Sequence, residues 1–343
     1  MSAPETVEAG VREINQSEAL NEALHEEMQR DPNVWVMGED IGEIGGLFKV
    51  TNGLLTRFGS QRVISSPISE AAIAGAGVGA ALVGCRPVVE VQIADFVSLM
   101  MDQVVNHAAK WRYMSGGKVT VPFVLRGPVS SGIGMAAQHS QTLEAWFVHA
   151  PGLIVIMPST PYDAKGLLKS AIRDDNPVVF LEKRLLYSRL GPVPEGEYLV
   201  PIGVADVKRP GTDVTVVTYS MGVPMSLQAA RQLAAEGIEA EVVDIRTLKP
   251  LDIETIAESV TKTGRLVVVS EGCRAGGMAS EIVARVCDEV FGALKAPPVR
   301  VTAADVPMPY AAQLERAVLP QVEDIVAGIK QAVGELVGAS GEA

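Results

Sequence analysis

Short runs of apolar, mostly β-branched residues alternate with helical patterns through the first half of the chain. The apolar runs have the length of buried strands and occupy residues 34–38, 86–93, 119–127, 153–158 and 177–183. Most segments between them space their apolar residues three or four positions apart, which is typical of a helix packed on one side. Strands that alternate with helices form a parallel sheet covered on both faces.

The first helix is predicted to begin at Ser17, a good N-cap residue. Apolar side chains follow it in helical steps at Leu20, Leu24 and Met28. We expect the polar residues before this helix, 1–15, to form a flexible arm.

A second α/β block follows residues 190–211, which are rich in proline and glycine and have little periodicity. Strands are predicted at 213–219, 239–245, 265–271 and 298–302, with helices near 223–236, 252–262, 278–291 and 321–337. The length of 343 residues suits about two domains. The predicted class is therefore α/β with two doubly wound domains: an arm 1–15, a first domain 16–190, a linker 191–211 and a second domain 212–340.

Composition narrows the function classes. The chain carries 41 acidic and 29 basic residues, a formal charge of −12, so we expect no nucleic-acid partner. No apolar run is long enough to span a membrane. Cys85, Cys273 and Cys287 form no CxxC pair, which fits free thiols in a reducing compartment. We expect the bacterial cytoplasm, and a mature mitochondrial protein would show the same pattern.

Residues 65–84, SSPISEAAIAGAGVGAALVG, contain a glycine fingerprint at Gly75, Gly77 and Ala80. A dinucleotide-binding loop needs a strand that runs directly into the glycine turn, and the residues before Gly75 look helical instead. We therefore predict a helix with Ser66 as N-cap and Pro67 at the first helical position. Its small residues would let another helix or chain approach closely.

Glu70 is the one carboxylate in this stretch, and it has two interpretations. A glutamate in the first turn of a helix is favoured by the helix dipole, and this is the common explanation for an acid there. The neighbouring residues, however, are apolar or small, so we expect the helix to be buried all round. A buried glutamate must be paired, hydrogen-bonded or raised in pKa, and each condition marks a candidate site.

Many segments together resemble the β subunit of the E1 component of 2-oxo acid dehydrogenase complexes, over almost the whole chain after residue 15. They include GED (38–40), VTNGL (50–54), FGSQRVISSPISEAAIAG (58–75), DFVSLMMDQVVNHAAKWRYMSGGK (95–118), LRGP (125–128), AAQHSQ (136–141), PGLIVIMPSTPYDAKGLLKSAIRDDNPVVFLE (151–182), DIRTLKPLD (244–252) and TAADVPMPYA (302–311). The resemblance implies a thiamine-diphosphate enzyme with a pyrimidine-binding domain and a transketolase C-terminal domain.

The resemblance also implies roles for four residues. Glu70 would hydrogen-bond N1′ of the cofactor's aminopyrimidine and so promote activation of the thiazolium ring. Phe96 would pack on the pyrimidine, although by itself it is typical of a core phenylalanine. His139 would lie at the mouth of the site and assist acyl transfer to the lipoyl arm, although a loop histidine is commonly a surface or capping residue. Glu39 would line a polar passage between two active sites, on which Leu99 is apolar here.

The chain contains no GDG motif, the sequence that holds magnesium in thiamine enzymes. The resemblance therefore implies that an α subunit supplies the diphosphate and Mg²⁺ half of the site in an α2β2 heterotetramer. An obligate interface would explain the small apolar residues 71–83. The family also holds a monovalent cation, usually K⁺, for which Asp174 and Asn176 are candidate ligands. A charged turn that caps a helix explains those two residues equally well.

The leading hypothesis is a β subunit that acts with its α subunit to decarboxylate a 2-oxo acid and reductively acylate the lipoyl group of an E2 partner. MSGGK and TAADVPMPYA look like the pyruvate type, whereas Asp95 is closer to the branched-chain and acetoin types. A split transketolase half and a non-catalytic assembly subunit are the alternatives. The second domain would dock the subunit-binding domain of E2, for which acidic residues are candidate contacts: Glu271, Glu323 and Asp324.

Overall fold

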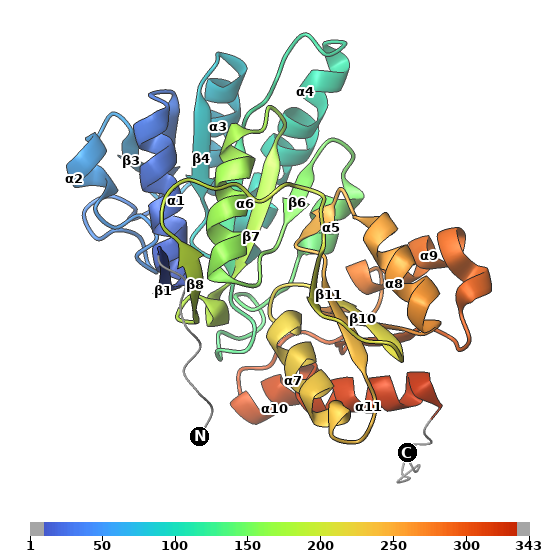
Figure 1. Cartoon of the computed structure of the whole chain (residues 1–343). Coiled ribbons are helices and arrows are strands. Elements are labelled where there is room, and N and C mark those ends of the chain that lie inside the picture. The colour runs from blue at the N-terminus through green and yellow to red at the C-terminus, as the bar shows by residue number, and fades with distance from the viewer. Residues whose placement is uncertain (1–9, 335–343) are drawn as a thin grey trace.

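The computed structural model describes residues 10–334, which form two α/β halves, each built on its own main sheet (Figure 1). The first sheet has seven strands, of which the five predicted from apolar runs are confirmed. Its strands are, in spatial order, β12 (Thr247–Lys249), β6 (Ile154–Ile156), β7 (Val178–Lys183), β5 (Val124–Val129), β4 (Arg86–Glu90), β2 (Val34–Gly38) and β3 (Val63–Ser65). All are parallel except β12, which pairs antiparallel with β6.

Helices cover both faces of the first sheet. On one face α1 (Gln16–Arg30) packs beside α6 (Pro161–Arg173). The other face is covered by α3 (Glu70–Leu82), a 3₁₀ helix (Ala94–Met100), a π-helical segment (Asp102–Ala108), α4 (Ala109–Met114) and α5 (Glu144–His149). The short α2 (Leu54–Phe58) lies between β2 and β3 in the sequence.

The second sheet has five strands in the order β14 (Val299–Ala303), β13 (Leu266–Cys273), β10 (Val214–Thr218), β11 (Ala240–Asp244) and β9 (Asp206–Arg209). Helices α7 (Gly222–Ala234) and α11 (Val322–Val333) cover one face, and α8 (Ile253–Thr263) and α9 (Met278–Val290) cover the other. Between β14 and α11 lies the short α10 (Ala312–Val318). The four predicted strands and four predicted helices of this half are confirmed, and residues 335–337 of the last predicted helix lie outside the described residues.

The two halves share structure that their sequence patterns do not show. Strand β12 lies beyond the linker in the sequence but extends the first sheet. One apolar core runs from α3 and the 3₁₀ helix across to α8 and α9 of the second half. The second half therefore takes part in holding the first sheet and the loops at its edge.

Three expectations near the predicted arm and linker were wrong. Helix α1 begins at Gln16, because Asn15 is the N-cap: its side chain accepts a hydrogen bond from the backbone N–H of Glu18 at 2.9 Å. Residues 11–15 of the arm form strand β1 (Val11–Asn15), and residues 1–9 lie outside the described residues. The linker begins with β8 (Leu190–Pro194), which pairs with β1, and contains β9. Prolines fit β8 because, among the described residues, it pairs on one edge only.

Helix α3 also differs from expectation. It begins at Glu70 with Ser69 as N-cap, because Ser66 and Pro67 lie in the turn from β3, where the Ser66 hydroxyl donates to the Pro67 carbonyl. Nor is the helix buried all round: one face packs on the core and the other is exposed at Ala71, Ala72, Ala76 and Gly79. The sequence pattern cannot distinguish the buried face from the exposed face, because both consist mainly of small residues.

The glycines of α3 offer a matched test of its packing. A Cβ at Gly77 would lie 2.7 Å from the Phe123 ring and 2.7 Å from Val89, whereas a Cβ at Gly79 meets no atom within 4 Å. We expect Gly77→Ala to lower the free energy of unfolding by about 1–3 kcal/mol through overpacking. Gly79→Ala should raise it by up to about 1 kcal/mol, because alanine favours the helix. Urea denaturation of both variants measures this, and equal effects would contradict the packing.

None of the helices within residues 10–334 combines the length and apolar character that a membrane crossing requires.

Candidate active site

The predicted site residues lie at the carboxyl ends of neighbouring strands in the first sheet. Glu39 follows β2, and Glu70 opens the helix after β3. Phe96 lies in the 3₁₀ helix that follows β4, and His139 lies in the loop between β5 and α5. The carboxyl ends of parallel strands meet at one edge of a sheet, where α/β folds place their sites. The topology β5-β4-β2-β3 therefore brings the four segments to one edge.

Glu70 combines burial with the lack of a partner. Only 8% of its surface is exposed, and within residues 10–334 its carboxylate makes no hydrogen bond or ion pair. A nearly buried carboxylate without a partner is costly, since burial removes its hydration. Both sequence interpretations hold in part, because Glu70 is a first-turn residue and is also buried. This arrangement suits a group held ready for a ligand.

Glu39 lies close enough to Glu70 to feel its charge. Only 7% of Glu39 is exposed, and burial raises the pKa of its carboxyl, with further increases from the charges of Glu70 and Asp40. A carboxyl with a raised pKa holds a proton more readily near neutral pH. The structure thus brings together two acids that lie 31 positions apart in the sequence.

Phe96 and His139 form the second pair. Their ring centroids lie 5.3 Å apart and the rings meet edge to face. Next to Phe96, Asp95 Oδ1 accepts hydrogen bonds from the backbone N–H and the side-chain amide of Gln141, each at 3.0 Å. Asp95 is buried, and this burial raises the pKa of its carboxyl. From the sequence, Asp95 was identified only as a substrate marker; its part in fixing the histidine loop was missed.

A buried ionic network lies behind Glu39 and was also missed. The guanidinium of Arg126 on β5 bonds both Glu182 on β7 and Glu90 on β4, and the Tyr187 hydroxyl donates to Glu182. Burial raises the pKa of Glu90 although the charge of Arg126 lowers it. Opposite charges inside three neighbouring apolar strands were the signal that could have revealed this network.

Glu144 opens α5 directly after the histidine loop and links the two halves. It is fully buried, and its Oε1 accepts a hydrogen bond from the Tyr219 hydroxyl at 2.7 Å. That hydroxyl also lies 2.8 Å from Ser270 Oγ. Within residues 10–334 the Glu144 Oε2 atom has no hydrogen-bond partner. Burial, more than any other cause, raises the pKa of Glu144 to about 7.

The raised pKa of Glu144 predicts a stability change with pH. Between its ordinary value of 4.5 and about 7 the folded chain keeps a proton that the unfolded chain has lost, so stability falls as pH rises. The change amounts to about 3 kcal/mol. We expect Glu144→Gln, which keeps the shape, to remove this part of the slope. Urea unfolding at several pH values compares the two proteins, and parallel pH profiles would contradict the assignment.

Three further positions were singled out from the sequence: Leu99, Asp174 and Asn176. Leu99 is 56% exposed, on the outside of the 3₁₀ helix. Asp174 ends α6, and its Oδ1 accepts hydrogen bonds from the backbone and the side chain of Asn176. The Asn176 oxygen in turn accepts from Arg112 at 2.9 Å. This is the geometry of a helix-capping turn, and the cation at this position stays a prediction.

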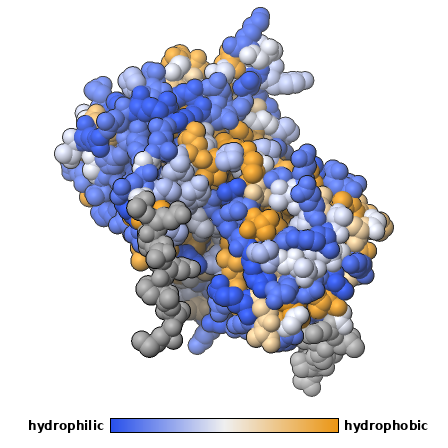
Figure 2. Space-filling model, in the orientation of Figure 1, coloured by the Kyte–Doolittle hydropathy of each residue, from blue (hydrophilic) through white to orange (hydrophobic). Residues whose placement is uncertain are grey.

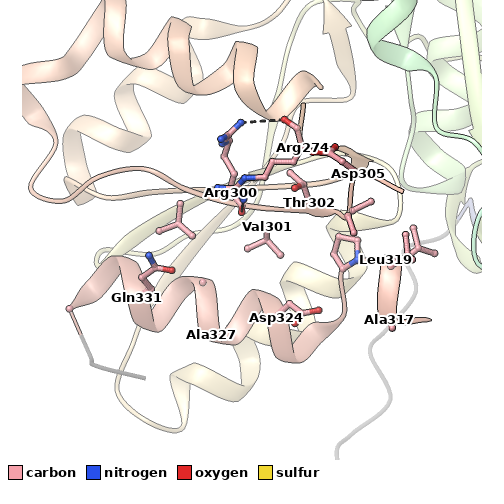
Figure 3. Close-up of a pocket in the computed structure, with 17 residues that line it drawn as sticks. Arg274, Arg300, Val301, Thr302, Asp305, Ala317, Leu319, Asp324, Ala327 and Gln331 are labelled. Atoms are coloured by element: carbon pink, nitrogen blue, oxygen red, sulfur yellow. Dashed lines mark hydrogen bonds between the residues drawn. The ribbon is translucent and has the colours of Figure 1, made fainter. Parts of the chain in front are cut away.

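A large groove lies elsewhere, on the second half (Figure 3). Its volume is about 750 Å³, and it runs between the edge strand β14 and helix α11, with Arg274 and Arg300 on one side and Asp324 on the other. Arg274 donates to the Arg300 carbonyl, which covers part of the strand edge. A second cavity of about 440 Å³ separates the histidine loop from residues 303–308. Neither is lined by Glu39, Glu70 or Phe96, so neither marks the acidic site.

Each half of the chain matches a known domain family. Residues 12–189 match the transketolase pyrimidine-binding domain, and residues 203–325 match the transketolase C-terminal domain. A solved structure described as a split gene transketolase, inactive β4 tetramer, superimposes with a TM-score of 0.77 at 24% identity, covering 93% of this chain and 98% of that one. This likeness confirms the fold.

Full-length relatives are more specific. The chain is 50% identical over 328 residues to the mitochondrial pyruvate dehydrogenase E1 component subunit beta-1 of Arabidopsis thaliana, covering 94% of this chain and 90% of the relative. It is 48% identical to the pyruvate dehydrogenase E1 component subunit beta of Rhizobium meliloti, covering 91% and 68%. It is 46% identical to the 2-oxoisovalerate dehydrogenase subunit beta of Bacillus subtilis, covering 92% and 97%. The chain therefore belongs to the β-subunit family of 2-oxo acid dehydrogenase E1 components, with a transketolase pyrimidine-binding domain and a transketolase C-terminal domain.

Proposed function

We propose that this chain is the β subunit of a thiamine-diphosphate-dependent pyruvate dehydrogenase E1. With its α subunit it would decarboxylate pyruvate and reductively acylate the lipoyl group of E2. The observation that carries the proposal is the nearly buried Glu70 carboxylate, which has no partner within residues 10–334 and lies beside Glu39 at the strand ends. The pyruvate-type relatives are 48–50% identical, against 46% for the 2-oxoisovalerate type, which favours pyruvate.

The residues present fit one half of the cofactor. The family implies thiamine diphosphate, which when bound supplies the nucleophilic carbon that attacks the 2-oxo group. Glu70 would share a proton with N1′ of the aminopyrimidine, and the low local dielectric would strengthen that hydrogen bond. Phe96, half-buried against the core, would pack on the pyrimidine ring and exclude water. Glu39 would hold a proton close to Glu70 as part of a polar passage.

His139 would act at the other end of the reaction. Its ring lies edge to face on Phe96, in a loop fixed by Asp95. An imidazole can donate or accept a proton, and here it would give one to the sulfur that leaves when the lipoyl disulfide is opened and its other sulfur is acylated. We propose that His139 lies at the mouth of the site.

The diphosphate half is assigned to the α subunit. Within residues 10–334 no cluster of three or more histidine, cysteine or acidic residues could hold a metal ion, and the sequence lacks GDG. We therefore propose that the α chain supplies the Mg²⁺ ligands. A K⁺ ion near Asp174 and Asn176 would have to compete with the Arg112 guanidinium for the Asn176 oxygen.

The exposed face of α3 supports an obligate partner. Its small side chains adjoin two large apolar residues that are almost fully exposed, Ile68 at 81% and Val83 at 82%. Figure 2 shows hydrophobic surface at the upper end of this half, where α3 and α4 lie. A patch of this kind marks a protein interface. We propose that it is buried in the α2β2 heterotetramer.

The E2 partner is proposed to dock on the second half. Of the acidic candidates, Glu323 and Asp324 are exposed on α11, whereas Glu271 is occupied by an ion pair with the buried Lys183 at 2.8 Å. The lipoyl domain of E2 would reach the first half, near His139. The relatives come from bacteria as well as mitochondria, and we propose the bacterial cytoplasm as the compartment, with the mitochondrion as the alternative.

The proposal is tested with the chain reconstituted with an α subunit that carries GDG, in the presence of thiamine diphosphate and Mg²⁺. Reduction of dichlorophenolindophenol is measured with pyruvate, branched-chain 2-oxo acids and acetoin. We expect pyruvate to give the highest kcat/KM. Preference for one of the others would mean that this compound, and not pyruvate, is the substrate. Ketol transfer between sugar phosphates without any dye reduction would identify the chain as half of a split transketolase instead.

A further inference from the structure

The loop that carries His139 is held by a carboxylate from the opposite half of the molecule. Glu315 on α10 is 3% exposed. Its Oε1 accepts a hydrogen bond from the backbone N–H of Gly132 at 2.8 Å, and its Oε2 accepts one from the backbone N–H of Gly134, also at 2.8 Å. The partners lie 183 and 181 positions apart in the sequence. This contact therefore joins the two halves of the molecule.

The backbone of the loop is shaped for this carboxylate. Gly132 has φ of +92° and Gly134 has φ of +74°, in the left-handed region that other residues rarely adopt. Backbone N–H groups in such a turn can converge to form a concave site for an anion. Within residues 10–334 the two glycine N–H groups are the only hydrogen-bond partners of the Glu315 side chain, so the buried charge depends on them.

A second carboxylate fixes the other end of the same loop. Asp95, from the first half, holds Gln141 two residues after His139, and Glu315 holds Gly134 five residues before it. Between these anchors His139 contacts the ring of Phe96. The side chain is therefore placed by one acid on each side, of which only Asp95 belongs to the half that contains Glu70.

We propose that Glu315 is a positioning residue for His139: through Gly132 and Gly134, the C-terminal half sets where the imidazole stands for acyl transfer to the lipoyl group. The proposal rests on the function proposed above. It assigns to α10 a part in the second half-reaction, although α10 contributes no residue to the cofactor end of the site. Loss of the contact should disturb transfer to the lipoyl group and leave decarboxylation almost intact.

The test variant is Glu315→Gln in the α2β2 protein. Glutamine has the same shape, but its amide group would face one of the glycine N–H groups as a donor facing a donor. We expect pyruvate-dependent acylation of the lipoylated E2 domain to fall by about 10- to 100-fold, because small misplacements of a reacting group have effects of this size. Dye reduction with pyruvate should change by less than about twofold, because the dye replaces the lipoyl acceptor on which His139 is proposed to act.

Hydrogen–deuterium exchange supplies a readout that does not depend on activity. We expect faster exchange in the peptide that covers residues 130–141 of Glu315→Gln. Lys208→Met is the matched control, because Lys208 also joins the two halves, through an ion pair with Asp163 at 2.8 Å that does not touch the loop. The control should leave loop exchange and lipoyl acylation unchanged. Glu315→Asp, which keeps both acceptor oxygens, should recover part of the lost rate.

The double variant with His139→Ala separates the two proposals. If Glu315 acts through His139, adding Glu315→Gln to His139→Ala lowers lipoyl acylation no further. If His139→Ala alone leaves acylation unchanged, the proposed role of His139 is wrong and the positioning role is lost with it. If His139→Ala is impaired but Glu315→Gln shows normal exchange and normal acylation, only the positioning role is overturned. Equal losses in decarboxylation and in lipoyl acylation would show that Glu315 has only a structural role.

Discussion

Glu70→Gln is expected to lower kcat of the reconstituted α2β2 enzyme by about 10²- to 10⁴-fold, the usual contribution of a positioned acid or base. Glutamine fills the same volume at the start of α3 but cannot take up a proton, so the hydrogen bond to the cofactor pyrimidine would lose its proton-sharing character. The carboxylate has no hydrogen-bond or ion-pair partner in the described part of the chain, so the substitution breaks no internal bond. Folding should therefore be preserved, and steady-state kinetics with pyruvate measure the loss.

Glu254→Gln is the matched control for this prediction. Glu254 is also a first-turn glutamate, on α8, but it is exposed. If helix-dipole stabilisation were the whole role of Glu70, the two variants would behave alike, with small losses of stability and normal turnover. Normal kcat in Glu70→Gln would remove the catalytic assignment and leave the first-turn interpretation.

Arg126→Met is expected to lower the free energy of unfolding by about 3–5 kcal/mol, because it leaves buried carboxylates without their cation. Arg126 is 1% exposed and bonds both Glu90 and Glu182. Methionine fills most of the volume, so the loss reports the stranded charges and not a cavity. Chemical denaturation of the isolated chain gives the value.

A surface pair provides the comparison for Arg126. Arg12 also makes a two-bond contact with a carboxylate, that of Glu22, at 2.8 Å for each bond, but its side chain is 37% exposed. We expect Arg12→Met to cost about 0–1 kcal/mol, as is usual for an exposed ion pair. Similar losses in the two variants would show that burial of the network around Arg126 does not determine its contribution.

Much of the fold could be predicted from the apolar pattern, because buried parallel strands are continuous apolar runs. Five strands of the first sheet and four of the second were found in this way. The elements that were missed have other sources of stability. Strand β12 is three residues long and forms only because it extends β6 antiparallel from the other half. Strands β1 and β8 are polar or proline-rich and, within residues 10–334, pair only with each other.

The individual residues of the candidate site could be predicted from the sequence, but the contacts between them could not. Glu70 stood out because it was the one acid in an apolar stretch, and the family resemblance supplied its role. Local sequence could not show that Gln141 bonds Asp95, or that Glu315 reaches Gly132 and Gly134, because both contacts depend on tertiary packing. The exposure of one face of α3 was hidden for a similar reason, since alanine and glycine occur on both faces of the helix.

We propose that this chain forms half of an active site, in which Glu70 acts beside an α subunit. The most direct test of this proposal is a titration of a fixed amount of this chain with the α chain at saturating thiamine diphosphate, Mg²⁺ and pyruvate, with dye reduction as the readout. We predict no turnover from either chain alone and a rise that saturates at equal amounts of the two. Turnover by this chain without the α subunit, or a saturated α2β2 complex that does not oxidise any 2-oxo acid or acetoin, would contradict the account.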